Sequence, residues 1–473
     1  MKKYFLFAAV VATGMLASCS SDSLIAGPDP NIEPTQEERV PIEIGVASVQ
    51  TKATTRGIGT VGGTTVGTNV WKGEKVNVFM FDKNKLDLAE DVPGSGDYLY
   101  NDVVLTTPND GSSTGQAFEY LTPTTIQHKY YPQGKERNFD FWGYYVDDAN
   151  VAAVAADAEN AVDATSPQAS EIVNGDQDVI VPFIINGTQD LMVAKAYPNE
   201  TDAATIATWG DDKDRFYSAF AARRNIQPEL SFKHLLTRLT FTIQGGNDDA
   251  CGYPLPAPTG NYTGVFVKSI TIKSQESGYI VAAYTRADMT DDDRYEDPTK
   301  LIKFYDTDAN GDEVPDNYVP FNLTSAGGRD LYSFDITDDD AVEAALDVTS
   351  GNFAEIIRPT TDGAGNYDEV SAGDAMLVQP RASYVMEIEL GQYLLDVEDK
   401  DPLTDADDDG DNDDNKYIIK SSTISNLPVT IDGGFKAGNS YNVNVTVWGY
   451  EEIKITTTLE KWADGGNVNV EYD

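Results

Sequence analysis

The sequence predicts an all-β protein made of β-sandwiches, with a few short surface helices. From Val70 onward, short runs with alternating apolar or clustered aromatic residues are separated by turn residues; KVNVFMFD at 75–82 and YNVNVTVWGY at 441–450 are two of them. A period of two is typical of strands that bury one face. Thr, Val and Ile, together with 25 Tyr and 18 Phe residues, also favour strands.

Helices are expected only in loops. Residues 147–164 are rich in Ala and carry acidic residues near their start, and residues 338–346 have a similar composition. Ala has the highest helix propensity, and acidic residues are favourable in a first helical turn. Both segments are therefore predicted to be surface helices.

The length predicts two domains. A single hydrophobic core stops growing near ~250 residues, and the chain has 473. Two polar segments compete as the junction, residues 197–227 and the loop-like residues 245–264. We place the boundary before Pro228, which gives an N-terminal domain at 57–227 and a C-terminal domain at 228–450.

The charge balance restricts the partners. Acidic residues number 78 and basic residues 34, which gives a formal net charge of -44. Nucleic acids and anionic membrane surfaces are repelled by such a chain. The ordinary reason for this much acid is solubility at an exposed location.

The first 19 residues predict export with a lipid anchor. Lys2 and Lys3 are followed by an apolar stretch that is too short to span a bilayer, and Cys19 comes directly after small residues. This pattern resembles a bacterial lipobox, which implies that residues 1–19 are a lipoprotein signal peptide and that Cys19 is lipidated. Residues 20–39 are then a disordered leash. Once Cys19 carries lipid, only Cys251 remains, so no disulfide within the chain is expected.

Residues 40–56 read as a strand followed by a cut site. Ile42, Ile44 and Val46 alternate with less apolar residues, as in a strand that buries one face. The chain then runs through Thr, Lys and Ala to Arg56 and into a Gly-rich stretch, which should be accessible to proteases. A strand meant for burial thus precedes a segment that can be severed.

Residues 451–473 form a tail with two further alternating stretches. Trp462 begins the break between them. One interpretation is a tail that completes another subunit, and the other is a pair of ordinary strands of its own domain. The apolar residues of the two stretches are Ile453, Ile455, Leu459, Val468 and Val470.

The sequence has no recognisable arrangement of catalytic residues, and we expect that the protein is not an enzyme. The chain has two histidines, His128 and His234, and neither lies at a spacing that suggests a metal site or a nucleophile with its base. With 78 acidic residues, a pair of carboxylates carries no information.

Two acidic loops begin like calcium loops, with oxygen ligands at alternate positions and a Gly for the turn. Asn317 and Lys416 stand where the bidentate Glu would be, so solvated hairpin tips are the preferred interpretation and no cofactor is expected. The weak calcium candidates are Asp306, Asp308, Asn310, Asp405, Asp407 and Asp409.

Several stretches in order resemble the fimbrillin family, the lipoprotein-derived type V pilins of gut and oral anaerobic bacteria. They are VWKGEKVNVFMFD, KYYPQGKERNFDFWGYYV, NGTQDLMVAKA, LSFKHLLTRLTFTI, FKAGNSYNVNVTVWG and ITTTLEKWADGGNVNVEYD. The resemblance covers most of the chain and is weakest at 149–175 and 288–374.

The resemblance implies two transthyretin-like β-sandwich domains and assembly by donor-strand exchange. A trypsin-like, Arg-specific protease would cut between Arg56 and Gly57 and so remove the first strand with Ile42, Ile44 and Val46. The tail of a neighbouring copy would then fill the groove. The donor residues would be Ile453, Ile455, Leu459, Trp462, Val468 and Val470.

The same resemblance implies a location and partners. The precursor would be an outer membrane lipoprotein handled by the lipoprotein processing machinery, and the mature form a stalk subunit of an extracellular fimbrium that serves cell adhesion. Its partners would be other copies of itself and related anchor and tip pilins. The alternative is a surface-anchored, monomeric lipoprotein that binds glycans through exposed aromatic residues such as Trp142, Tyr144 and Tyr145.

Overall fold

Strands dominate the structure, as the sequence predicts. The structure is a computed structural model. Val40–Asp473 forms one compact unit, and Met1–Arg39 forms another, of which only Arg39 is described. The described residues are 39–46, 74–82, 98–107, 115–117, 119–122, 125–132, 138–146, 168–169, 177–246, 265–285, 295, 297–304, 318–323, 370–395, 417–449 and 452–460.

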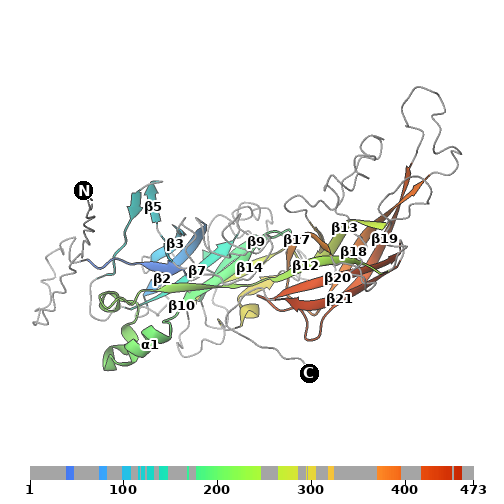
Figure 1. Cartoon of the computed structure of the whole chain (residues 1–473). Helices are drawn as coiled ribbons and strands as arrows, with labels where there is room; N and C mark the ends of the chain where they lie inside the picture. The colour runs from blue at the N-terminus through green and yellow to red at the C-terminus, as the bar shows by residue number, and fades with distance from the viewer. Residues whose placement is uncertain are drawn as a thin grey trace, which may run out of the picture. The chain divides into compact units, whose positions relative to one another are not determined.

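A seven-stranded sheet, which we call the leader sheet, contains the first strand of the chain. Its order is β3 (Tyr98–Thr106), β2 (Lys75–Asp82), β7 (Phe139–Val146), β10 (Leu191–Ala196), β11 (Glu229–His234), β1 (Ile44–Val46) and β4 (Gly115–Ala117). Figure 1 shows β2, β7 and β10 side by side. Neighbours are antiparallel except β1 and β11, which are parallel.

Apolar residues cover both faces of the leader sheet. Along β2, Val78 and Met80 belong to one buried cluster, while Phe79 and Phe81 belong to another. The period of two of a strand sends successive side chains to opposite faces, so a nearly continuous apolar run such as VFMF is buried on both sides. Ile44 in β1 belongs to the same cluster as Val78, and we call this cluster the leader core.

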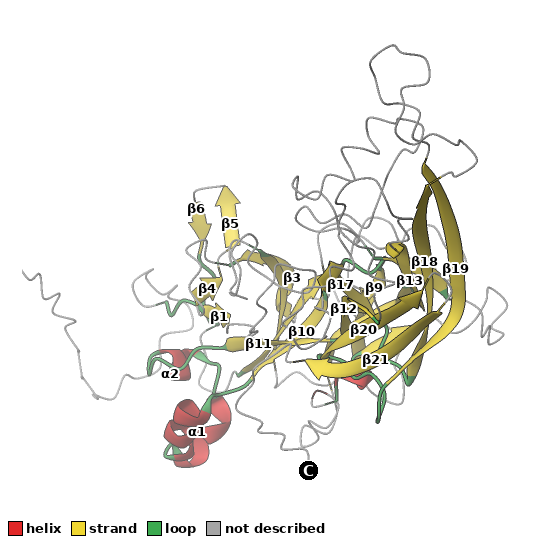
Figure 2. Ribbon diagram, turned by 45° about the vertical axis from the view of Figure 1, so that its right-hand side comes forward, coloured by secondary structure: helices red, strands yellow, loops and turns green. Residues whose placement is uncertain are grey.

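Three further sheets complete the fold (Figure 2). The first has the order β15 (Ile302–Phe304), β14 (Ser277–Thr285), β9 (Gln177–Ile184), β8 (Gln168–Ala169). The second has the order β17 (Val370–Val378), β12 (Thr237–Gly245), β20 (Ser440–Gly449), β21 (Glu452–Glu460). The third has the order β16 (Val319–Asn322), β13 (Val265–Ser274), β18 (Ser383–Leu395), β19 (Tyr417–Thr430). A separate hairpin joins β5 (Glu119–Thr122) to β6 (Thr125–Gln127). The all-β sandwich class is as predicted.

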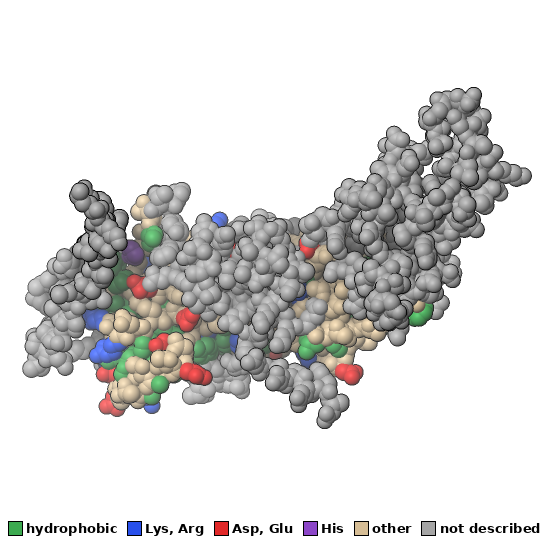
Figure 3. Space-filling view, in the orientation of Figure 1, with side chains coloured by type: hydrophobic (Ala, Val, Ile, Leu, Met, Phe, Trp, Pro, Cys, Tyr) green, Lys and Arg blue, Asp and Glu red, His purple; other side chains and the backbone are tan. Residues whose placement is uncertain are grey.

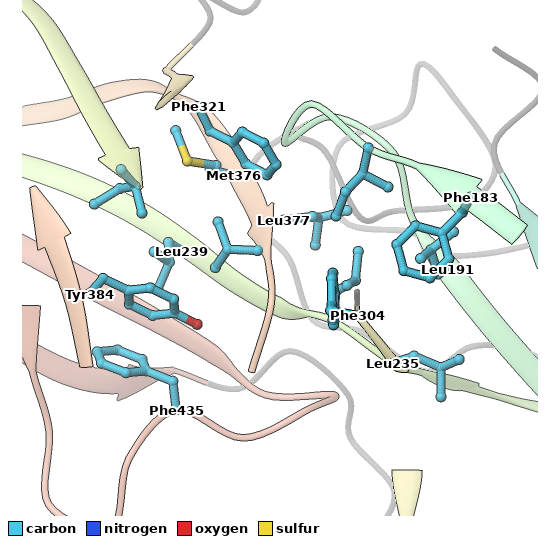
Figure 4. Packing of buried hydrophobic residues seen from close by; sticks show 14 of the residues in the cluster. Phe183, Leu191, Leu235, Leu239, Phe304, Phe321, Met376, Leu377, Tyr384 and Phe435 are labelled. Atoms are coloured by element: carbon cyan, nitrogen blue, oxygen red, sulfur yellow. The ribbon is translucent and has the colours of Figure 1, made fainter. Parts of the chain in front are cut away.

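A large core extends across these sheets. Figure 4 shows Leu239 of β12 and Leu377 of β17 among its aromatic side chains. The rings of Tyr384 and Phe435 lie 4.6 Å apart, and the Tyr384 hydroxyl donates a hydrogen bond to the Gln379 carbonyl at 2.7 Å. A buried Tyr hydroxyl needs such a partner, so this contact stabilises the start of β18.

Helices occur where the sequence analysis did not place them. The segment considered as a junction, residues 197–227, contains α1 (Glu200–Ala207), the 3₁₀ helix η3 (Gly210–Arg215) and α2 (Ala219–Ala222). A further 3₁₀ turn, η4, spans Pro298–Lys300. Asn199 caps α1 by accepting a hydrogen bond from the backbone N–H of Asp202. The predicted helices at 147–164 and 338–346 lie outside the described residues.

The chain changes sheets at Leu235 and Leu236. The run ELSFKHLLTRLTFTI at 229–243 contains two strands: β11 pairs with β10 in the leader sheet, and β12 pairs with β17 and β20. Both leucines are fully buried at the bend between the two strands, where they belong to the large core. The division at Pro228 stays a prediction.

None of the helices in the described ranges has the length and hydropathy of a membrane span.

Candidate functional site

The candidate site is the first strand of the chain, which lies inside a sheet rather than at its edge. We call residues Val40 to Val46 the leader strand. Its apolar side chains Ile42, Ile44 and Val46 are only 7%, 1% and 1% exposed and belong to the leader core. Burial of one large apolar side chain contributes ~1.5–3 kcal/mol, so these three supply the main attraction of the strand.

We call the place that the leader strand occupies the slot. One wall is antiparallel: β4 pairs with β1 in the register Ile44 to Ala117, and the wall continues at Lys129, whose carbonyl accepts from the Ile42 N–H at 2.8 Å. The Tyr131 N–H donates to the Val40 carbonyl at 2.9 Å. The other wall is β11, which lies beside β1 in Figure 2. In this pair Gly45 faces Glu229.

Aromatic rings line the part of the leader core around the slot. Tyr131 lies 6.1 Å from Phe139 and 6.3 Å from Phe141, centroid to centroid, and Phe141 meets Tyr217 edge to face at 5.8 Å. Tyr217 has a positive φ of 63°, which is unfavourable for a large side chain. Burial raises the pKa of its phenol, with nearby carboxylates adding to the shift, so the ring stays neutral.

Acidic residues begin the two helices that follow β10. Glu200 and Asp202 lie in the first turn of α1, and Asp211 and Asp212 in the first turn of η3. Figure 3 shows acidic side chains at the surface where α1 lies. Acidic side chains in a first turn interact favourably with the positive end of the helix dipole. Helix stability therefore accounts for these carboxylates.

The first stretch of the tail is paired within its own sheet. The strand β21 runs antiparallel to β20 along the edge of the sheet, with Ile453 opposite Val447 and Ile455 opposite Val445. Ile453 and Ile455 are partly buried, whereas Leu459 is 49% exposed. Trp462, Val468 and Val470 lie outside the described residues, and the leader strand and β21 belong to different sheets.

The remaining predicted site residues are distributed as follows. Cys19, Arg56 and Gly57 lie outside the described residues, as do the calcium candidates Asp306, Asp308, Asn310, Asp405, Asp407 and Asp409. Within the described part of the chain, no three His, Cys, Asp or Glu residues gather as they would around a metal ion.

The two histidines lie in different settings. His128 is exposed beside the wall residue Lys129. His234 is buried at the end of β11, where its Nδ1 lies 2.8 Å from Oδ2 of Asp190. Burial of both partners makes this pair part of the packing between β10 and β11.

The glycan alternative expected exposed aromatic residues, and this expectation is wrong for two of them. Trp142 is 1% exposed and Tyr144 is 4% exposed. Both lie in β7, which is covered on both faces, and the Trp142 ring packs 4.6 Å from that of Tyr284. Tyr145 is half-buried against the leader core. The rings of Trp142 and Tyr144 are packed in the protein core and offer no stacking platform.

One residue at the slot was missed by sequence reasoning. The Gln227 side chain contacts the leader strand through both amide atoms: Nε2 donates to the Pro41 carbonyl at 3.3 Å, and Oε1 accepts from the Glu43 N–H at 3.5 Å. The Tyr131 hydroxyl donates to the same Oε1 at 3.3 Å. Nothing near Gln227 in the sequence marks it, because its partners are between 96 and 186 positions away.

Comparisons with known proteins give structural neighbours only. No protein-family model and no curated protein sequence matches the chain. A solved structure described as a cell adhesion protein from Bacteroides ovatus aligns with a TM-score of 0.38 and 12% identity, covering 90% of this chain and 98% of its own. A similar protein from Bacteroides uniformis gives 0.34 and 11%, covering 91% and 100%.

A third neighbour is the fimbrial anchor protein Mfa2 from Porphyromonas gingivalis, with a TM-score of 0.27 and 8% identity over 89% of this chain and 99% of its own. Adhesion and fimbrial proteins are the class that the sequence resembles.

Proposed function

We propose that this chain is a structural subunit of a bacterial surface fimbrium, and that it assembles by losing its leader strand and accepting a strand of another subunit. The observation that carries the proposal is the position of the leader strand. It lies between β11 and β4 inside a sheet, yet it comes first in the described chain and precedes the cut site expected at Arg56.

Removal of the leader strand would leave a site that requires a strand. The carbonyl of Pro228 and the backbone of Lys129 and Tyr131 would lose their partners. Unpaired backbone groups beside an apolar channel are the groups that β-augmentation satisfies. A strand from another copy fits this description, and such a head-to-tail contact does not close on itself, so it extends into a filament.

The tail is the proposed donor, because its apolar spacing matches that of the leader strand. Ile453 and Ile455 are two residues apart, as are Ile42 and Ile44. The donor would leave its place beside β20, where β21 is the edge strand of the sheet and Leu459 is half exposed. An edge strand with little burial is the element of a sheet that detaches most easily.

The test is cleavage with an Arg-specific protease. The precursor is expected to give a product that begins at Gly57 and a ladder of oligomers, seen by N-terminal sequencing and by electrophoresis without heating. Arg56→Ala is expected to remain a folded monomer, because the leader strand stays in the slot and blocks the donor.

Arg39→Ala is the matched control, since a cut after Arg39 leaves the leader strand in place. This variant should assemble like the unmodified chain. Filaments formed by Arg56→Ala with its N-terminus intact would disprove the cleavage step.

Lipidation at Cys19 is the proposed route to the surface. Cys19→Ser is expected to remove the lipid, shown by loss of radiolabelled fatty acid, and to prevent delivery to the outer surface, shown by antibody labelling of whole cells. The purified protein should melt at an unchanged temperature, because residues 20–39 are predicted to separate Cys19 from the fold. Normal surface fimbriae from the Cys19→Ser strain would contradict the lipoprotein route.

A further inference from the structure

The parallel wall of the slot has a gap at Pro228. Here β1 and β11 are paired only at Gly45 with Glu229 and Val46 with Leu230. Pro228 accepts from the Gly45 N–H at 2.8 Å through its carbonyl, but it has no N–H with which to donate to the leader strand. The backbone of β11 therefore stops pairing just where the leader strand continues toward Pro41.

The Gln227 side chain fills this gap as a peptide group would. In a parallel pair, a residue donates to the carbonyl before the residue it faces and accepts from the N–H after it. The Gln227 amide does both around Ile42: it donates to the Pro41 carbonyl and accepts from the Glu43 N–H. The ladder thus extends past Pro228 through a side chain.

Tyr131 closes the arrangement from the other wall. Its N–H donates to the Val40 carbonyl on the antiparallel side, and its hydroxyl donates to Oε1 of Gln227 on the parallel side. The leader strand at Ile42 is therefore held between two wall residues that are bonded to each other.

We call the hydrogen-bonded Gln227 and Tyr131 the clamp. The clamp acts on the register of the leader strand. A slip of one residue would turn Ile42, Ile44 and Val46 out of the leader core, so burial excludes it. A slip of two residues keeps the alternation. In the slip that moves Val40 to the place of Ile42, apolar residues still face the leader core, but Pro41 takes the place of Glu43 and has no N–H to donate to Oε1 of Gln227. The Gln227 amide therefore favours the native register over this slip.

We propose that Gln227 is a positioning residue that holds the leader strand in register against the two-residue slip that brings Pro41 to the place of Glu43. The same amide would bind the backbone of an incoming strand. This extension rests on the proposed function, because only then does a second strand meet the same amide.

The test measures register by disulfide trapping in the uncleaved, full-length chain carrying Cys19→Ser and Cys251→Ser. Gly45→Cys with Gln116→Cys traps the native register, because these two residues are direct partners. Glu43→Cys with Gln116→Cys traps a slip of two. Gly45 directs its N–H toward β11, so its pair with Gln116 is of the closer, non-hydrogen-bonded kind.

With Gln227 intact, the native disulfide is expected to predominate. In Gln227→Met, which keeps the length without hydrogen bonds, the ratio of slipped to native disulfide should rise about fivefold or more. Gln227→Ala should give the same rise, and Gln227→Glu, which keeps an acceptor for the Glu43 N–H, should stay near the native ratio. An unchanged ratio in Gln227→Met would overturn the proposal, and that variant keeps the test valid if Gln227→Ala fails to fold.

A second measurement separates this proposal from the proposed function. A synthetic peptide of residues 451–461 is added to protein cut after Arg56, and binding to Gln227→Met should be about fivefold weaker or more than to the unmodified protein. If the disulfide ratio shifts but the peptide binds neither protein, the clamp holds for the leader strand and the strand-exchange function is wrong. Equal binding to both proteins would overturn the extension to an incoming strand.

Discussion

Replacing Ile44 by Asp is expected to empty the slot without any protease. Ile44 is 1% exposed in the leader core, and a carboxylate there would lose its hydration without gaining a partner. The leader strand comes first in the described chain, so it can leave while β11 and β10 remain paired. The uncleaved Ile44→Asp protein should then form oligomers, and the amides of β11 should exchange hydrogen faster.

Glu43→Ala is the matched control for this prediction. Glu43 is the neighbouring residue, and its side chain is not part of the leader core, so its replacement should leave a protected monomer. Oligomers of Ile44→Asp should disappear when the tail is removed after Gly449, which separates strand exchange from general aggregation. Loss of the whole fold in Ile44→Asp would show that the leader strand is an integral strand of its sheet, and a monomer with unchanged exchange would show that the slot stays filled.

Ending the chain at Gly449 is expected to abolish assembly while the subunit stays folded. The truncation removes β21, whose Ile453 and Ile455 are partly buried and whose Leu459 is half exposed. The strand β20 keeps its parallel partner β12 and becomes the edge. The melting temperature should fall by only a few degrees, since about 1 kcal/mol shifts it by roughly 2–4 °C in a domain of about 150–250 residues.

A chain that ends at Glu460 is the control, because it keeps β21 and loses Trp462, Val468 and Val470. If this chain still assembles, β21 alone is the donor; if it does not, the later stretch takes part. A chain ending at Gly449 that is unfolded or aggregated would show that β21 is a structural strand of its own domain and not a donor.

Much of the fold was accessible from local patterns. The run KVNVFMFD coincides with β2, because alternation and aromatic content are properties of neighbouring residues. The helix α1 was missed although its signal is local, with Asn199 as N-cap and Asp202 three residues later. Composition directed attention to the Ala-rich segments instead, and helix propensity alone is a weak guide.

Other features could not be read from the sequence. Two of the three aromatic residues of the glycan interpretation, Trp142 and Tyr144, proved to be core, because whether a residue of β7 faces solvent depends on which elements cover that strand. The change of sheet at Leu235 was also hidden, since a bend between two sheets leaves the apolar pattern of the run unbroken.

For the candidate site, the sequence by itself determined that the segment with Ile42, Ile44 and Val46 is extended and has one apolar face, since alternation is a local property of the backbone period. Only the tertiary structure decided which walls hold that strand and that Gln227 extends one of them past Pro228. Those contacts join residues 184 and 186 positions apart, and hydrogen bonds to the backbone leave no mark on the side-chain pattern from which a sequence is read.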